Sequence, residues 1–186
     1  MELKSSAFKA YDIRGKFPEE VNEELAYRIG RVFPTLFNAK RVAVGHDIRL
    51  SGPDIQKALE LGLTEMGCEV VDIGQCGTEM IYFATAHLGL DGGIMITASH
   101  NPKEYNGYKV YDDTGCQLIP EWGDIVVDYV NEIDDELEIE QISDEEAYPF
   151  ITWVGEEVDE AYYKAVMGIE INPGLDKSDF KIVYSP

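Results

Sequence analysis

Hydrophobic residues follow two patterns along this chain, a helical spacing of three to four residues and short unbroken runs. The helical spacing covers residues 18–37 and 51–67, whereas the unbroken runs, typical of buried strands, cover residues 41–45, 69–74 and 94–96. The apolar positions of the first helix are Val21, Leu25, Ile29, Val32, Phe33 and Leu36. Because helices and strands alternate, the pattern predicts an α/β fold, a layered mixed sheet with helices on both faces.

Further elements are predicted around the last buried run. A shorter helix covers residues 78–89, and residues 108–111 form a strand that returns beside its predecessor. Another helix is predicted from residue 121 to about residue 133. Ser51 is expected to cap the helix that follows it, as the first member of a capping box.

An acidic run separates this unit from the rest of the chain. Residues 132–146 contain many carboxylates and no lysine or arginine, which favours a solvated connector; an acidic metal-binding loop is the alternative, although calcium-type spacing is missing. A final helix is predicted over 156–167 and a strand over 180–184. The predicted division is a first domain at residues 1–133, an acidic connector at 134–155 and the start of a second α/β domain at 156–186.

Composition limits the partners of the chain. Its net charge of −21 over 186 residues disfavours nucleic acid and anionic membrane surfaces, which would repel it. Any phosphate site must therefore be a local concentration of arginine, lysine and backbone N–H groups. The odd number of cysteines, without metal-type spacing, indicates free thiols in a reducing compartment, and no apolar run is long enough to cross a bilayer. We therefore expect a cytoplasmic protein without a membrane partner.

A polar cluster at residues 97–102, Thr-Ala-Ser-His-Asn-Pro, directly follows the buried run at 94–96. Ligands of α/β sheets bind beyond the carboxyl ends of the strands, so this cluster is well placed for a site. Pro102 restricts the backbone, and we expect a rigid turn that presents the Ser99 hydroxyl outward. The neighbouring His100 suggests a serine hydrolase, but adjacent side chains on an extended backbone point to opposite sides, which argues against that class.

Three cationic side chains each allow a functional and a purely structural interpretation. Arg14 has a planar fork of donors that suits phosphate, and a strand or turn with a local salt bridge is the alternative. Arg49 could face the same site, or it could form a loop ion pair with Asp47. Lys109, judged by its surroundings alone, is an exposed lysine on an edge strand.

Several motifs resemble one family. Residues 97–102, with Asn-Gly-Tyr-Lys at 106–109 beyond them and Phe-Lys-Ala-Tyr-Asp-Ile-Arg-Gly at 8–15 before them, look like the first domain of the α-D-phosphohexomutases. Residues 77–79 and 81–85 resemble in particular the phosphomannomutase branch, which serves GDP-mannose synthesis. The resemblance is dense over most of the first predicted domain and weak beyond it.

The resemblance implies catalytic roles for four residues. Ser99 would be the phosphorylated serine, which donates its phosphoryl group to a hexose phosphate and recovers one from the bisphosphate intermediate. Lys109 would be the general acid or base. Arg14 would neutralise the developing charge, and His100 would orient the phosphoserine.

The resemblance also implies a substrate pocket and a metal. Asn101 would help to orient the reacting hydroxyl, and Tyr11 would line the same pocket. Mg²⁺ would be bound through the phosphate of Ser99, with its remaining ligands in a second domain. A hexose 1,6-bisphosphate would act as activator, and a phosphosugar would be the substrate.

The sequence departs from the family in its extent. The family's second domain holds an Asp-x-Asp-x-Asp loop, which does not occur here, and the adjacent pairs at 112–113 and 134–135 are no substitute. We therefore expect the N-terminal part of an intramolecular phosphotransferase that interconverts mannose 6-phosphate and mannose 1-phosphate, with little activity by itself. The alternatives are a phosphoglucomutase, a phosphoglucosamine mutase, or a catalytically silent binding module.

Overall fold

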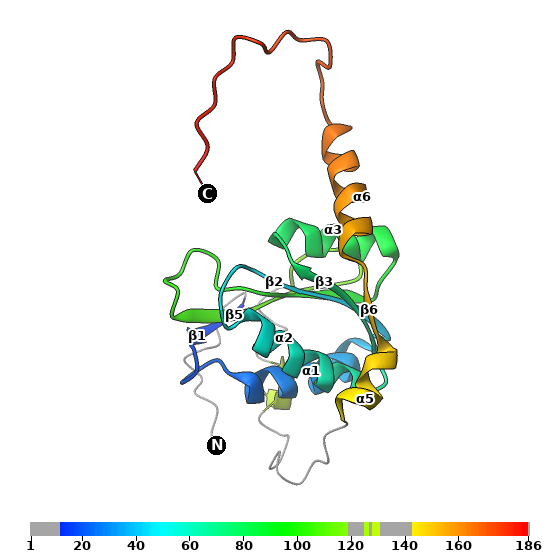
Figure 1. The fold of residues 1–186 in the computed structure, drawn as a ribbon. Helices are drawn as coiled ribbons and strands as arrows, with labels where there is room; N and C mark the ends of the chain where they lie inside the picture. The colour runs from blue at the N-terminus through cyan, green and yellow to red at the C-terminus, as the bar shows by residue number, and fades with distance from the viewer. Residues whose placement is uncertain (1–11, 119–124, 127, 131–142, 186) are drawn as a thin grey trace.

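The computed structural model describes residues 12–118, 125–126, 128–130 and 143–185. These residues form one six-stranded sheet with helices on both sides (Figure 1). In chain order the elements are β1 (Ile13–Lys16), α1 (Glu23–Phe37), β2 (Arg41–His46), α2 (Gly52–Glu65), β3 (Glu69–Gln75), α3 (Thr78–Leu88), β4 (Gly92–Ile96), β5 (Tyr105–Tyr111), α5 (Asp144–Ala147), η3 (Tyr148–Phe150), β6 (Ile151–Trp153) and α6 (Gly155–Met167).

The sheet is mixed, with the strand order β1-β5-β4-β2-β3-β6. β4, β2, β3 and β6 run parallel to one another, whereas β5 is antiparallel to both β4 and β1. β5 therefore returns beside its predecessor, as the sequence predicted. Parallel strands covered on both faces are expected to be apolar throughout, and β4 is buried along its whole length.

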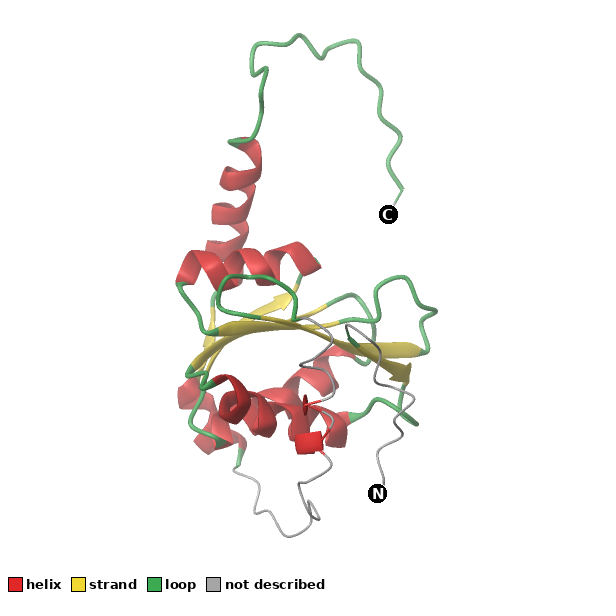
Figure 2. Cartoon of the chain, turned by 180° about the vertical axis from the view of Figure 1, so that it is seen from behind, coloured by secondary structure: helices red, strands yellow, loops and turns green. Residues whose placement is uncertain are grey.

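Helices cover the two faces of the sheet, which confirms the predicted layered α/β fold. α1 and α2 lie on one face, and α3 with the start of α6 lies on the other (Figure 2). The first face is packed mainly by Leu25, Ile29, Leu59, Leu63, Val44, Ile94 and Tyr108. The second is packed by Ile81, Ala84, Met95, Tyr111 and Val158. Successive strand residues alternate between these two cores.

The first helix begins later than its apolar spacing predicts. α1 starts at Glu23 rather than at residue 18, because the Asn22 side chain accepts a hydrogen bond from the Leu25 N–H at 3.0 Å and caps the helix there. Val21 is still fully buried, since it packs on the core from the turn before the helix. The predicted helix at 121–133 lies only partly within the described residues, and these are helical at 125–126 and 128–130.

The end of the chain differs in part from the prediction. β6, inside the stretch expected to be a connector, pairs with β3 and extends the sheet of the first domain. α6 matches the predicted helix, but no strand forms at residues 180–184, where Val183 is 99% exposed. A β-strand requires a hydrogen-bonding neighbour, and this segment has none within the described residues. None of the described helices is long and apolar enough to cross a membrane.

Candidate active site

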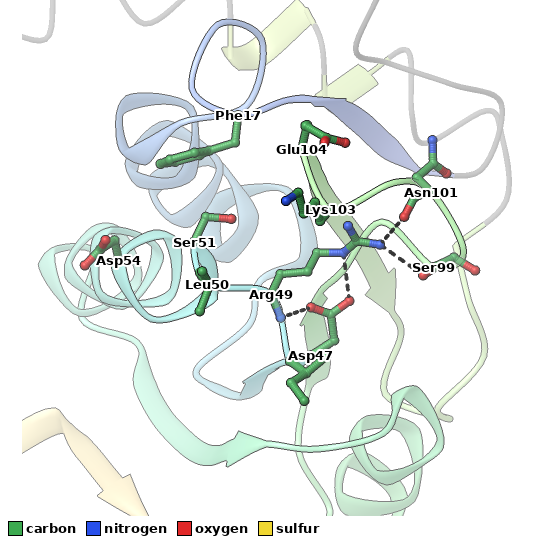
Figure 3. Close-up of a pocket in the computed structure, with 11 residues that line it drawn as sticks. Phe17, Asp47, Arg49, Leu50, Ser51, Asp54, Ser99, Asn101, Lys103 and Glu104 are labelled. Carbon is green, nitrogen blue, oxygen red and sulfur yellow. Dashed lines mark hydrogen bonds and ion pairs between the residues drawn. The ribbon is translucent and has the colours of Figure 1, made fainter. Parts of the chain in front are cut away.

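The site lies at the carboxyl ends of two neighbouring parallel strands. β2 pairs with β4 from Val42↔Gly92 to His46↔Ile96, so the segments that follow them leave the sheet at the same edge. A cavity of about 560 Å³ lies between these segments (Figure 3). It is lined by Phe17, Asp47, Ile48, Arg49, Leu50, Ser51, Asp54, Ser99, Asn101, Lys103 and Glu104.

Ser99 lies on an exposed turn three positions beyond β4, at the rim of this cavity. Its φ of 56° is left-handed, which costs a residue with a Cβ about 1–2 kcal/mol. Surrounding contacts must therefore hold it there. The exposed position of Ser99 agrees with the sequence prediction.

His100 differs from the prediction. Its Nδ1 lies 3.3 Å from Ser99 Oγ, although the sequence suggested that the two side chains point apart. That prediction was wrong because it assumed an extended backbone, whereas Ser99 is left-handed. The contact does not make a hydrolase triad, since the described residues place no carboxylate within hydrogen-bonding distance of His100.

Arg14 reaches the serine turn from β1, the edge strand. Its Nη1 donates to Asn101 Oδ1 at 3.0 Å, while its Nε donates to Asp12 Oδ2 at 2.8 Å. The local salt bridge and the approach to the site, which the sequence offered as alternatives, are therefore both present. The Nη2 of Arg14 also lies 2.6 Å from Asp12 Oδ2, so within the described residues two of the five guanidinium N–H groups remain without a partner.

The close approach of β1 depends on Gly107. Arg14 is opposite Gly107 in the β1–β5 ladder, and a Cβ at position 107 would lie only 1.9 Å from the backbone oxygen of Ile13. No side chain other than that of glycine fits this contact. The glycine of the Asn-Gly-Tyr-Lys motif thus allows Arg14 to lie beside the serine turn.

Lys109 lies on β5, opposite Met95 of β4, and is half-buried. Alternation along β5 places it on the same face of the sheet as Tyr111 and on the face opposite to Tyr108. Within the described residues its amine forms no hydrogen bond or ion pair. Among the described residues, the structure does not join the Lys109 amine directly to Ser99. Tyr11 lies outside the described residues.

Arg49 forms both of the contacts that the sequence offered as alternatives, whereas Ser51 differs from its prediction. Asp47 and Arg49 form the loop ion pair, with Nε and Oδ2 3.1 Å apart, and Arg49 also reaches the backbone of the serine turn. Ser51 does not cap α2 with its side chain; its Oγ instead accepts from Nδ2 of the fully buried Asn106 at 2.9 Å. The signal for Arg49 was its place directly after a buried strand.

Two other reactive side chains, Cys76 and Asp112, are respectively protonated and hydrogen-bonded within their own turn. Burial, together with the charge of Asp159, raises the pKa of the Cys76 thiol to about 12, so this cysteine stays protonated. Cys68, Cys76 and Cys116 are free thiols, as predicted. Asp112 accepts hydrogen bonds from Thr114 and Cys116 within its own turn. The part of the chain that the structure describes contains no cluster of three or more metal-binding His, Cys, Asp or Glu side chains.

Sequence comparison places these features in a family. The family described as phosphoglucomutase/phosphomannomutase, alpha/beta/alpha domain I, matches residues 5–137. A phosphomannomutase of Escherichia coli strain K12 is 54% identical over 107 residues, which are 58% of this chain and 24% of that protein. A Xanthomonas campestris protein named phosphohexose mutases is 56% identical over 104 residues, covering 56% of this chain and 23% of that protein. This chain thus matches about a quarter of the length of these relatives.

Solved structures agree with this match. A phosphoglucomutase/phosphomannomutase family protein from Burkholderia thailandensis superposes with a TM-score of 0.70 at 31% identity, covering 88% of this chain and 36% of that one. A structure titled putative phosphomannomutase, from Thermus thermophilus, has the same TM-score of 0.70 at 28% identity, covering 87% of this chain and 35% of that one. With the family match spanning most of the chain, this protein belongs to the phosphoglucomutase/phosphomannomutase family and carries its α/β/α domain I.

Proposed function

We propose that this chain is the phosphoryl-carrying N-terminal part of a phosphomannomutase-type phosphohexomutase. The observation that supports this most directly is the serine turn itself. Ser99 is exposed, left-handed and at the carboxyl end of a buried strand, with Arg14 attached to the same turn through Asn101. Such a hydroxyl can be reached by a phosphosugar and has a cation close by.

The proposed reaction moves one phosphoryl group between Ser99 and a sugar oxygen. When phosphoserine 99 donates, a bond forms between the attacking sugar oxygen and phosphorus, and the bond between Ser99 Oγ and phosphorus breaks. The proton of the sugar hydroxyl leaves to a base, and the Ser99 oxygen takes up a proton from an acid as its bond to phosphorus breaks, which leaves a hexose bisphosphate and a free serine. The reverse step, from the other end of the hexose bisphosphate, restores phosphoserine. For mannose this interconverts the 6-phosphate and the 1-phosphate.

The side chains of the site have proposed roles that follow from their places. Lys109 is the proton carrier, because its amine has no partner within the described residues. His100 orients the serine oxygen through the 3.3 Å contact. Arg14 neutralises charge on the transferring group with its unused N–H donors. Asn101 holds Arg14 in place, and Tyr11 is proposed to line the same pocket.

Mg²⁺ is a proposed cofactor, with this chain supplying only part of its ligands. Magnesium binds oxygen ligands, including phosphate oxygens. Phosphoserine 99 would offer such oxygens at an exposed position, whereas the carboxylates of Asp12 and Asp47 are paired with arginines. A bound Mg²⁺ would neutralise phosphate charge. The other ligands are proposed to lie in a second domain, beyond the connector, and a hexose 1,6-bisphosphate would prime the serine.

A catalytically silent binding module is the second candidate, because the structure, in the part of the chain that it describes, does not join the Lys109 amine directly to Ser99. A phosphoglucomutase or phosphoglucosamine mutase would share the same serine chemistry. By itself, the chain is proposed to accept phosphate without mutase turnover comparable to an ordinary enzyme.

Ser99→Ala tests the proposal. The chain is incubated with glucose 1,6-bisphosphate and Mg²⁺ and analysed by intact-mass and peptide mass spectrometry. We expect one added phosphoryl group on Ser99, complete loss of it in Ser99→Ala with an unchanged melting temperature, and no loss in Ser178→Ala, which alters another exposed serine. Absence of phosphate on the wild-type chain would favour the silent module.

A further inference from the structure

Arg49 lies against the inner side of the serine turn, and its guanidinium is fully engaged there. A guanidinium has five N–H donors. Four of them donate to backbone carbonyl oxygens, those of Ser99 (3.1 Å), Asn101 (2.8 Å), Pro102 (2.7 Å) and Tyr105 (2.9 Å). The fifth, on Nε, donates to Asp47 Oδ2 at 3.1 Å. Figure 3 shows Arg49 between the Asp47 carboxylate and the turn that bears Ser99 and Asn101.

The Asp47 carboxylate is also linked to the peptide group that precedes the Cα of Ser99. Asp47 Oδ2 accepts a hydrogen bond from Thr97 Oγ1 at 2.7 Å, and this hydroxyl oxygen in turn accepts from the Ser99 N–H at 2.9 Å. Because the Thr97 proton points to Asp47, the lone pairs of the hydroxyl are free to face Ser99. The peptide N–H before the Ser99 Cα and the carbonyl after it are therefore both tied to the Asp47–Arg49 pair.

These two connections account for the left-handed backbone at Ser99. Its φ of 56° is disfavoured for a residue with a Cβ, so it persists only where the surroundings determine it. Fixing the peptide group on each side of the Cα restricts both the φ and the ψ of that residue. A lysine at position 49 could not do this, since a single ammonium has three donors and no planar fork.

Arg49 has no donor left for a phosphate. All five of its N–H groups are used by protein acceptors, and its side chain is 9% exposed. The four carbonyl oxygens that converge on it point toward the guanidinium. Arg49 is thus suited to shaping the turn and not to contacting the substrate.

We infer that Arg49, paired with Asp47, is a positioning residue that sets the conformation of Ser99 for phosphoryl transfer. This inference rests on the proposed phosphorylation of Ser99. It identifies the residues that set the backbone conformation of this serine before phosphoryl transfer. It predicts that loss of the guanidinium fork relaxes Ser99 from its left-handed conformation and slows phosphate incorporation, without weakening the binding of the phosphate donor.

The test is Arg49→Lys in the full chain, with Arg41→Lys as the matched control, since Arg41 forms an exposed ion pair with Glu69 away from the serine turn. NOE spectra of ¹⁵N-labelled protein measure the intraresidue HN–Hα NOE cross-peak of Ser99. This cross-peak is strong for a left-handed residue, because the two protons lie close together at positive φ. Intact-mass kinetics measure phosphate incorporation from glucose 1,6-bisphosphate with Mg²⁺, and calorimetry measures the affinity for the bisphosphate.

For Arg49→Lys we expect a folded protein with a weakened Ser99 cross-peak, an incorporation rate at least about tenfold lower and an affinity within about twofold of wild type. Arg41→Lys should match wild type in all three. An Arg49→Lys protein that keeps either the cross-peak or the rate overturns the inference, because the two must change together.

Thr97→Val keeps the test decisive if Arg49→Lys does not fold. It removes only the hydroxyl that links Asp47 to the Ser99 N–H, so it should weaken the same cross-peak, and an unchanged cross-peak overturns the inference. If the wild-type chain accepts no phosphate, the proposed function fails, and the cross-peak in the two variants decides the conformational role of Arg49 by itself.

Discussion

Arg14 and Arg49 reach the same serine turn from different segments of the chain, and they are bonded differently. Arg14 comes from the edge strand β1, is 22% exposed and, within the described residues, keeps two N–H groups without a partner. Arg49 comes from the loop after β2, is 9% exposed and has every N–H group bound to protein. Both are paired with an aspartate.

This difference shows that a cation near a phosphate-accepting serine need not bind phosphate. An arginine whose donors are all satisfied by carbonyl oxygens acts on the backbone, whereas one with free donors can act on the ligand. The two roles make opposite demands on burial. They should therefore separate when each arginine is removed.

Arg14→Ala is expected to have the largest effect on chemistry. Loss of its free donors should lower the rate of phosphate incorporation into Ser99 by about a hundredfold, the usual cost of removing one preorganised charge-stabilising donor. Because Arg14 lies at the sheet edge, the Ser99 NMR cross-peak should stay as in wild type. Arg41→Ala serves as control. A variant with a normal rate would show that Arg14 does not act on the phosphoryl group.

Gly107→Ala should have a smaller effect on phosphate incorporation, which acts through the position of Arg14. Its Cβ would meet the Ile13 oxygen at 1.9 Å, so β1 must move and carry Arg14 away from Asn101. We expect about tenfold slower incorporation and a free energy of unfolding lower by about 1–3 kcal/mol, measured in urea. Gly174→Ala, where an added Cβ meets nothing within 4 Å, should change neither quantity. Retention of wild-type stability would contradict the close contact.

Glu60 has a carboxylate that, unlike Asp12 and Asp47, forms no ion pair with an arginine among the described residues. Its replacement should have the smallest effect on phosphate incorporation. Its Oε1 accepts from Gln56 Nε2 at 2.7 Å, and the same nitrogen donates to Asp72 Oδ1 at 2.6 Å. Burial, and then the charge of Asp72, raises the pKa of Glu60 from 4.5 to about 7. The folded protein thus holds this proton more tightly than the unfolded chain does.

The contribution of Glu60 to stability is therefore fully present below pH 4.5 and is lost as the pH rises through about 7. Glu60→Gln, which cannot ionise, should gain stability relative to wild type by about 1–3 kcal/mol between about pH 5 and pH 8, with unchanged phosphate incorporation. Melting curves over this pH range measure it, with the exposed Glu69→Gln as control. A pH-independent difference would show that Glu60 is charged throughout.

Much of the fold could be predicted from the sequence because its signals are local. The buried runs became β2, β3 and β4 almost to the residue, and the polar cluster lies beyond β4 as expected. The start of α1 was missed because the Asn22 cap competes with apolar spacing. The strand expected at residues 180–184 requires a partner that no local pattern can supply.

For the candidate site, the sequence predicted the exposed position of Ser99 beyond β4 but not the contacts around it. Ser99 and His100 were expected to point apart, and Ser51 was expected to cap a helix. Both predictions failed because contacts between distant segments decide them: Arg49 lies 50 positions from Ser99, and Ser51 lies 55 positions from Asn106.

The sequence by itself determined the alternation of helices and strands, the serine at the end of a buried strand, and the motifs that place the chain in its family. Those features depend on neighbours in the chain, through periodicity and turn chemistry. Only the tertiary structure decided that β2 lies beside β4 and that Gly107 allows β1 to pack against β5. It also decided that all N–H groups of Arg49 bind protein acceptors, whereas Arg14, within the part of the chain that the structure describes, keeps two without a partner. Strand order and backbone conformation at such a turn arise from contacts across the sheet, which the spacing of residues does not encode.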